Sequence, residues 1–413
     1  MNIANLFKFI LILLSFASCS QTDKNKEFIN SESPSKVNYE NKYTLELEEQ
    51  IKAPLYDDIS SRSYYYKLYK DSLFYFAYKN KLAILNLNTQ KIRKIAIPEY
   101  LLKNDIYGIE VINQDSLFIS ERYPPSISLI TLTNDTVVLK KHFLKKINLE
   151  TDNESYNNDV ALTEEAEANF NLDDNGLAYN KVTKQLHIGF EAYDYVNFAG
   201  FENTHQIGVY DWKNNEWVDS YAPPQGLRKN KGKNSYGSSP LSRKKFLLKG
   251  DSTIVYSELN HGITLYKEGN FIGNIPFVSA LSEKIKSPLS FNESNEIERV
   301  LELMHTSPKY SKTFYHEKVK LYSRIYLAQQ NTINALGQKN VADDRQAYIV
   351  FQDENFNYVG EYKLDDKTFE SRIVGTSDGF LMFANKYDET DLTDSYFPLR
   401  YKYKIVTNTS SND

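Results

Sequence analysis

The feature that most constrains this chain is a degenerate repeat of short apolar strands separated by tight polar turns. The clearest unit has four strands, with turns at Asp71-Ser72 and Asn88-Thr89-Gln90, and it ends at Pro98. Similar units follow, and the six span residues 64–97, 107–143, 185–221, 245–276, 320–364 and 369–406. Four-stranded units repeated around a ring are the blades of a β-propeller. The sequence therefore predicts an all-β fold, a six-bladed β-propeller.

The sixth unit has one strand fewer than the first. The missing strand is available near the start of the chain, where residues Tyr43–Ile51 alternate apolar and polar side chains with the period of a β-strand. We predict that this N-terminal strand pairs into the last blade and closes the ring. Closure joins the first and last repeats and removes an exposed sheet edge.

Three insertions interrupt the repeats, at residues 144–175, 222–242 and 279–312. Short helices are predicted in two of them, over Asp159–Ala168 and Asn295–His305. In the second helix, Asn295 and Glu298 have the spacing of a capping box. Its apolar side chains, which recur at helical spacing, either pack on the propeller or dock a partner: Ile297, Val300, Leu301 and Met304.

The first residues have the pattern of a bacterial lipoprotein signal. Lys8 precedes an apolar run at 9–14 that is too short to span a bilayer, and small residues lead to Cys19. We predict a signal peptide at 1–18, a polar flexible tether at 19–42 and a propeller domain at 43–408. The alternative is an ordinary cleaved signal with an incidental cysteine.

Cys19 is the only cysteine of the chain. Its acylation would anchor the protein to the membrane through lipid and would leave no free thiol for catalysis or metal binding. The predicted location is therefore the cell envelope, with a lipid anchor in the outer membrane. The protein faces either the periplasm or the cell surface.

The repeats, the lipobox and the Tyr-rich composition together resemble a Bacteroidetes lipoprotein family of unknown function with a TolB-like six-bladed β-propeller. The segments that carry the resemblance are Tyr236–Pro240, Tyr310–Lys312 and Tyr315–Tyr326. The resemblance implies a fold and a compartment, and it implies no particular chemistry.

Motifs of catalysis and cofactor binding are absent from the sequence. No Walker loop, G-x-G-x-x-G or G-x-S-x-G occurs, the six His do not have metal-ligand spacing, and no acidic cluster forms a calcium loop. We predict no catalytic residue, no metal and no cofactor. The net charge of −5 contains no large block of one sign, so nucleic acid is not expected as a partner.

Four polar residues are candidates for the pore or rim of the ring: Arg122, Glu191, His316 and Arg324. Arg324 lies among apolar residues in a strand, where an unpaired charge is costly. We therefore expect it to pair with a carboxylate or to face the central channel.

A second set of candidates follows a recurring pattern of Asp, a hydroxyl residue, and then an apolar residue or Thr. The pattern resembles the acceptor motif of Bacteroidetes O-glycosylation, and it is equally suited to turns before strands. The candidate hydroxyls are Ser72, Ser116, Thr136 and Ser252.

The sequence favours a binding or scaffold lipoprotein that takes a protein, peptide or glycan ligand. The alternative is a propeller hydrolase or lyase with its site at the central channel. A sensor component is a third hypothesis, and it would need a partner because no signalling segment is fused. The side chains near the axis discriminate these hypotheses, since carboxylates with His favour an enzyme and a mixed polar and aromatic set favours binding.

Overall fold

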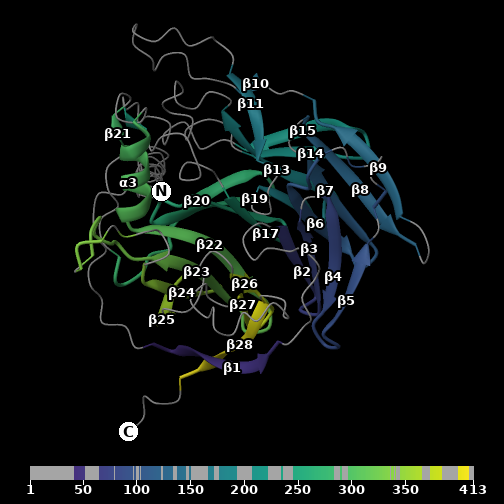
Figure 1. Ribbon diagram of the computed structural model, residues 1–413. Coiled ribbons are helices and arrows are strands. Elements are labelled where there is room, and N and C mark those ends of the chain that lie inside the picture. Colours follow the sequence, from purple (N-terminus) through teal and green to yellow (C-terminus); the bar gives the residue numbers. More distant parts are fainter. Residues whose placement is uncertain are drawn as a thin grey trace, which may run out of the picture.

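In the computed structural model of the chain, the described residues form a ring of antiparallel sheets (Figure 1). They are 41–51, 65–78, 80–95, 97–98, 102, 104–121, 124–133, 137–145, 148–149, 166–171, 176–192, 207–221, 234–235, 245–282, 289–290, 296–334, 336–338, 340, 345–364, 373–383 and 399–408.

Each sheet is one blade, and the chain fills it from the axis outward. Blade 1 contains β2 (Tyr65–Tyr69), β3 (Leu73–Tyr78), β4 (Lys81–Asn86) and β5 (Lys91–Ile95), and blade 2 contains β6 (Gly108–Asn113), β7 (Ser116–Glu121), β8 (Ser126–Leu132) and β9 (Val137–Phe143). Blade 3 contains β10 (Asn148–Leu149), β11 (Ala166–Asn171), β12 (Leu177–Asn180), β13 (Gln185–Ala192), β14 (Ile207–Asp211) and β15 (Glu216–Tyr221).

The remaining blades have four strands each. Blade 4 contains β17 (Lys245–Lys249), β18 (Ser252–Tyr256), β19 (Gly262–Lys267) and β20 (Asn270–Pro276), and blade 5 contains β22 (Lys309–His316), β23 (Leu321–Leu327), β24 (Ala347–Asp353) and β25 (Tyr358–Lys363). Blade 6 contains β26 (Ile373–Gly375), β27 (Gly379–Phe383), β28 (Leu399–Thr407) and β1 (Tyr43–Gln50). A separate pair joins β16 (Asn234–Ser235) and β21 (Leu289–Ser290). The six-bladed architecture predicted from the repeats is confirmed.

The N-terminal strand closes the ring as predicted. β1 pairs antiparallel with β28, from Tyr43 opposite Thr407 to Gln50 opposite Tyr401. The pairing continues beyond the strands, because the Asn408 amide donates to the Lys42 carbonyl at 2.8 Å. The last blade thus contains both ends of the domain, and β1 covers the outer edge of β28.

The hydrophobic core is divided among the interfaces between blades. Phe118, Leu186 and Tyr210 belong to the cluster between blades 2 and 3, and Phe351 and Phe380 to the one between blades 5 and 6. Alternate side chains of a strand point to opposite sides of its sheet, so each central strand serves two clusters.

Blade 5 corrects one expectation. Residues 279–312 were expected to be an insertion, but Lys309–His316 is β22, the innermost strand of this blade. The pairing of β22 with β23 shifts register between Tyr310 and Thr313. This irregularity breaks the alternation of buried side chains by which the other strands are recognised.

The helix predictions are partly right. α3 (Ile297–Thr306) lies in the segment expected to be helical, but its N-cap is Glu296, whose side chain makes no capping bond, so the capping box is wrong. The helix expected over Asp159–Ala168 is also wrong at its end. Ala166–Ala168 begin strand β11, which pairs with β10 and β13, and residues 159–165 lie outside the described part.

The connections differ sharply between the two faces of the ring. The first and second strands of each blade, and the third and fourth strands of the blades that continue directly, are joined by tight turns such as 70–72, 87–90 and 268–269. The longest connections begin and end at the opposite face, and include 193–206, 222–244, 277–308 and 328–346. We call these the turn face and the loop face.

Candidate functional site

Large hydrophobic side chains are exposed on the loop face of blades 4 and 5. Two connections carry them, 277–308, which includes α3, and 328–346. The exposed side chains are Leu281 (53%), Ile297 (73%), Leu301 (41%), Ile333 (57%) and Leu336 (82%). Large exposed apolar side chains on neighbouring connections are typical of an interaction surface.

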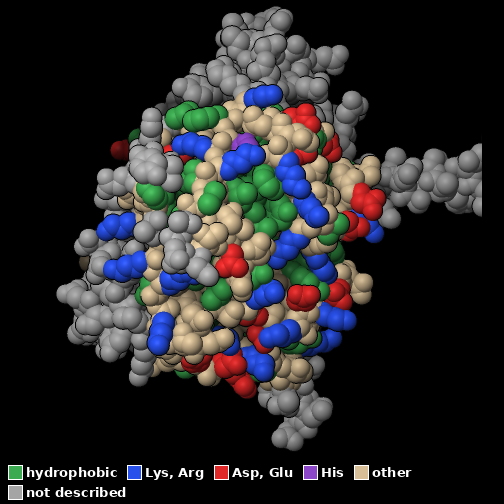
Figure 2. Space-filling model, turned by 90° about the vertical axis from the view of Figure 1, so that its right-hand side faces the viewer, with side chains coloured by type: hydrophobic (Ala, Val, Ile, Leu, Met, Phe, Trp, Pro, Cys, Tyr) green, Lys and Arg blue, Asp and Glu red, His purple; other side chains and the backbone are tan. Residues whose placement is uncertain are grey.

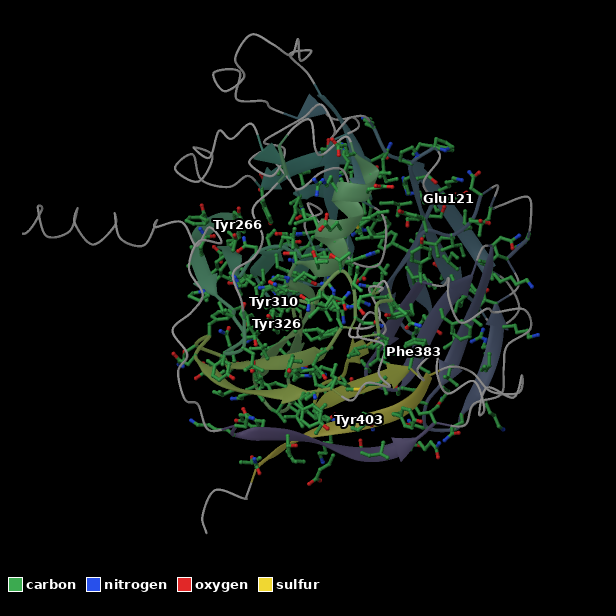
Figure 3. The ribbon with its side chains drawn as sticks, turned by 60° about the vertical axis from the view of Figure 1, so that its left-hand side comes forward. Glu121, Tyr266, Tyr310, Tyr326, Phe383 and Tyr403 are labelled. Atoms are coloured by element: carbon green, nitrogen blue, oxygen red, sulfur yellow. The ribbon has the colours of Figure 1, made fainter. Side chains whose placement is uncertain are left out.

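α3 is attached to the ring by one side. Val300, Leu303 and Thr306 are buried, and Leu303 packs with Tyr310 and Tyr326 in the core between blades 4 and 5. Figure 3 shows Tyr310 and Tyr326 next to each other, and their ring centroids are 5.2 Å apart. Ile297 and Leu301 lie at the edge of this packed side, and both are exposed.

Arg345 holds the C-terminal end of α3. Its guanidinium donates to the carbonyls of His305 at 2.9 Å and Ser307 at 2.7 Å. The last carbonyls of a helix have no partners within the helix and carry partial negative charge, so a cation here both satisfies and stabilises them. Gln330 adds a bond from its side chain to the His305 carbonyl at 2.8 Å. The helix is therefore tied to the base of the following loop.

In the loop 331–340, the side-chain amides of two asparagines hydrogen-bond to the loop's own backbone. The Asn334 side chain accepts from the backbone amides of Leu336 and Gln338, each at 2.9 Å. Asn340 donates from its side chain to the Asn331 carbonyl at 2.7 Å. Leu336 is thus presented at the tip of a turn whose backbone is fixed by side-chain bonds of the Asx type.

Beneath the loop face, the inner ends of blades 4 and 5 share an ion network. Glu258 accepts from Lys245 at 2.7 Å and from Lys309 at 3.3 Å. Burial opposes the charge of Glu258, but the two ammonium groups outweigh it and hold the pKa of this carboxyl at about 2. The network joins the starts of two innermost strands and gives the surface above it a fixed base.

Arg324 is fully buried in the same interface, and the carboxylate partner considered for it from the sequence is not found among the described residues. Its guanidinium instead donates to three carbonyls of blade 4 and stacks on the Tyr310 ring at 4.0 Å. The acceptors are Ser257 at 2.9 Å, Phe277 at 3.2 Å and Gly262 at 3.3 Å. Burial lowers the pKa of Arg324 to about 10, so it remains charged at neutral pH and ties blade 5 to blade 4.

His261 lies beside this guanidinium. Its Nδ1 is 3.1 Å from both the Ser282 hydroxyl and the Tyr310 hydroxyl. Burial first, and the Arg324 charge second, lower the pKa of His261 to about 4. The Ser–His contact is of the kind a nucleophile makes with its base, but the Ser282 hydroxyl is buried and shares the imidazole nitrogen with a tyrosine. The geometry supports a structural bond.

Of the other three rim candidates, the structure describes the side chain of His316 alone. His316 is fully buried between blades 5 and 6, where its Nδ1 lies 2.8 Å from the Thr376 carbonyl and its Nε2 lies 2.7 Å from the Ser323 hydroxyl. It therefore does not lie at an open rim. Glu191 belongs to β13, but its side chain is outside the described part, as is Arg122 altogether.

Three of the candidate glycosylation residues lie where the chain enters the second strand of a blade: Ser72 ends a turn, and Ser116 and Ser252 begin β7 and β18. Ser72, Ser116 and Ser252 are each half-buried on the turn face. The Ser252 hydroxyl donates to the Asp251 carboxylate at 3.1 Å, as expected for turn chemistry. Thr136 and Cys19 lie outside the described residues.

Near the axis, the innermost strands join polar and aromatic groups. Lys67 of blade 1 pairs with Glu110 of blade 2 at 2.9 Å, and Glu110 accepts from the Tyr179 amide of blade 3 at 3.2 Å. Lys312 of blade 5 donates to the Tyr66 hydroxyl of blade 1 at 2.6 Å. These contacts could not be predicted from the sequence, because they join residues of different blades.

The described residues show neither a metal site nor a membrane-spanning helix. No group of three His, Asp or Glu side chains is arranged to hold a metal ion. The helices of the same residues include none with the length and apolar character to cross a membrane.

Comparison with known proteins identifies the fold. No family profile and no curated protein matches the sequence. A member of the DUF4221 family from Bacteroides vulgatus is similar in structure, with a TM-score of 0.62 and 12% identity over 89% of this chain and 99% of that one. A putative exported protein from Bacteroides fragilis has a TM-score of 0.50 and 10% identity over 88% of this chain and 95% of that one. At these identities the likeness concerns the fold alone.

Proposed function

We propose that this chain is a lipid-anchored envelope protein whose propeller binds a protein, peptide or glycan on its loop face. The observation that carries the proposal is the asymmetry between the faces. The loop face has the long connections and the exposed apolar side chains of blades 4 and 5, whereas the turn face has tight turns. Propellers carry their functions in sites built on such connections.

The proposed location rests on the N-terminal sequence. Small residues before Cys19 and the short apolar run support export and acylation. The printed name of one structural neighbour, a putative exported protein, is consistent with an extracytoplasmic location. A Cys19→Ser variant should fold normally and leave the membrane fraction. If it stays with the membrane, the anchor is elsewhere.

The entry of the chain supports the same arrangement. Asn41 accepts from the Glu361 amide at 3.0 Å, and Lys42 lies beside the Val359 carbonyl and Asn408. These contacts lie at the C-terminal end of β28. That end is on the turn face, because Lys404 of β28 pairs with Gly379, the first residue of β27 after the tight turn from β26. A tether that enters there leaves the loop face turned away from the anchor.

Binding is favoured over a hydrolase or lyase at the axis. The contacts that join inner strands of different blades near the axis involve Lys67 with Glu110, the Tyr179 amide with Glu110, and Lys312 with Tyr66. General acid–base catalysis of bond cleavage uses a pair of groups with different proton affinities, and a histidine or second carboxylate at this place would have favoured it. The mixed polar and aromatic set supports the binding function.

Single-thiol cross-linking tests the proposal. Because acylated Cys19 has no thiol, Thr332→Cys on the loop face and Val182→Cys on the turn face each supply one reactive group. Both positions are exposed. With a short heterobifunctional cross-linker in native envelopes, the Thr332 thiol should give a discrete adduct and the Val182 thiol none. Equal labelling from both faces, or an adduct from Val182 alone, would overturn the assignment of the binding face.

We also propose O-glycosylation at one or more of Ser72, Ser116, Thr136 and Ser252. Glycans at the three described serines would lie opposite the proposed binding surface and would not cover it. Mass spectrometry of the native protein should find glycosylated peptides. Unmodified peptides at all four sites would end this proposal.

A further inference from the structure

We infer that α3 and the loop 331–340 form a docking site for a cationic amphipathic segment of a partner protein. This inference rests on the proposed binding function and adds the chemistry of the partner. We call the site the α3 strip, defined by Ile297, Leu301, Ile333 and Leu336 with the glutamates of α3.

The apolar part of the strip has the spacing that a partner helix can use. Ile297 and Leu301 are four residues apart and so lie on one side of α3. The same side leads to the last turn of the helix, to which Gln330 and Arg345 attach the loop. A ten-residue helix is about 15 Å long, enough to contact about three turns of a partner helix. An amphipathic helix of a partner can pack its apolar side chains against exposed apolar residues at this spacing.

The loop contributes because its exposed leucine is fixed. Leu336 projects from a turn held by the Asn334 side chain, and the Asn334 amide also donates to the Gln338 carbonyl at 2.8 Å. An apolar group on a preformed turn loses little conformational freedom when it is buried by a partner. Side chains of this kind are effective anchors.

Charge indicates which partner fits. Glu296, Glu298 and Glu302 are exposed around the apolar positions of α3, and Arg299 is the one exposed cation among them. Arg299 pairs with Glu302 at 3.3 Å, which leaves two glutamates without a cation on this helix. A partner with lysine or arginine beside its apolar side chains would be attracted and oriented by these charges.

The same charges argue against a membrane surface. Anionic lipid attracts basic segments and repels glutamates. The loop face is also opposite the rim where the chain enters at Asn41. Basic and apolar groups do occur together on this molecule at its outer strands, where exposed Val138 and Lys140 share one side of β9 and Lys141 lies over the exposed Phe143 ring. Figure 2 shows Lys and Arg side chains around a hydrophobic area on that side of the ring. A second copy is therefore one outcome to be tested.

The test uses a defined probe, an amphipathic peptide helix of Leu and Lys, with a Leu and Glu helix of the same pattern as reference. Fluorescence anisotropy should give a Kd of about 10–100 μM for the cationic peptide on the full mature chain with Cys19→Ser. E298K/E302K, I297S/L301S and L336S should each weaken binding about tenfold or more. All these side chains are exposed, so the variants should keep their melting temperature.

A matched control lies on β1, where Leu47 is exposed between Glu46 and Glu48. E46K/E48K should leave the affinity of the cationic peptide within about twofold. Equal losses at both places, or equal binding of the acidic peptide, would contradict the inference.

Sedimentation with anionic vesicles that depends on Leu336, or a concentration-dependent dimer abolished by E298K/E302K, would assign the strip to a membrane or to a second copy instead. Either result would overturn the proposed partner. An adduct from the Thr332 thiol together with failure of the peptide would leave the binding face in place and refute only the cationic chemistry.

Discussion

The interface between blades 1 and 2 and the interface between blades 4 and 5 each hold two neighbouring blades together, but with different side chains. The first is filled by aliphatic side chains with one tyrosine, among them Leu117, Ile119 and Ile130. The second has an aromatic core as well, but Arg324, His261 and Ser282 are buried within it. Apolar packing is indifferent to pH and tolerant of substitution by similar volumes, whereas buried polar groups must keep every partner.

The difference extends to the neighbouring interfaces. His187 packs between Tyr221 and Phe246 at the contact of blades 3 and 4, and His316 lies against Phe380 at the contact of blades 5 and 6. Three successive interfaces thus contain a buried imidazole. The blades below the α3 strip are joined by directional bonds, which fix their relative positions more specifically than aliphatic contacts.

The largest predicted difference is in the response to acid: low pH should destabilise the interfaces that contain a buried histidine more than the aliphatic interface of blades 1 and 2. Burial lowers the pKa of His187, His261 and His316 from 6.5 to about 4. Between these values the unfolded chain binds protons that the folded chain refuses, so the free energy of unfolding falls as pH decreases from about 6.5 to about 4. Each pKa unit corresponds to about 1.4 kcal/mol, so the three groups together remove several kcal/mol.

Hydrogen exchange of peptides, corrected for intrinsic rates, checks this prediction at pH 7.5 and pH 5. Protection should fall first at the interfaces between blades 3 and 6 and persist at the interface of blades 1 and 2. A uniform loss around the ring would show that the two kinds of interface do not differ in their response to acid.

Arg324→Met removes the charge at nearly constant volume and should cost about 3 kcal/mol, because three buried carbonyls lose their donor. Urea denaturation at pH 7.5 measures the cost. The loss should be accompanied by a higher His261 pKa, since the guanidinium disfavours its protonation. Unchanged stability would mean that the carbonyl bonds do not hold blades 4 and 5 together.

Ile119→Val is the matched change in the apolar interface. It removes one buried methylene and should cost about 1 kcal/mol by the same measurement. Its effect should be the same at pH 7.5 and pH 5.5, because the only titratable group buried in the cluster is Tyr75, whose pKa burial raises to about 12. A pH-dependent cost would break the contrast between the two interfaces.

Tyr66→Phe tests the smallest effect, at the axis. The substitution removes the hydroxyl that accepts from Lys312 and keeps the ring between Phe74 and Phe383. We expect a loss of about 0.5–1 kcal/mol in urea denaturation. A loss as large as that of Arg324→Met would show that the axis contributes more to cohesion than the interface of blades 4 and 5.

The sequence predicted the fold wherever strands alternate regularly. Blades 1 and 2 and the closing strand β1 follow their patterns closely. β22 was missed because its register shift between Tyr310 and Thr313 breaks the alternation. The inner strand β12 was missed because Leu177–Asn180 is too short to show a period.

The candidate site was less accessible to prediction. The helical spacing around Val300 identified α3, since burial of one helix side leaves a periodic signal. Leu336 carries no such signal, because exposure in a loop depends on the three-dimensional course of the chain. The carbonyls around Arg324 were equally hidden, since backbone acceptors occur at every position and only the packing of blade 4 on blade 5 selects three of them.

A hydrogen-exchange footprint of the protein in complex with its native envelope partner tests the central claim most directly. The partner would be the protein, peptide or glycan recovered through the Thr332 thiol. Binding should protect α3 and residues 331–340 and leave the turns at 87–90 and 212–215 unchanged. Protection on the turn face, with α3 exchanging as in the free protein, would contradict the assignment of the binding surface.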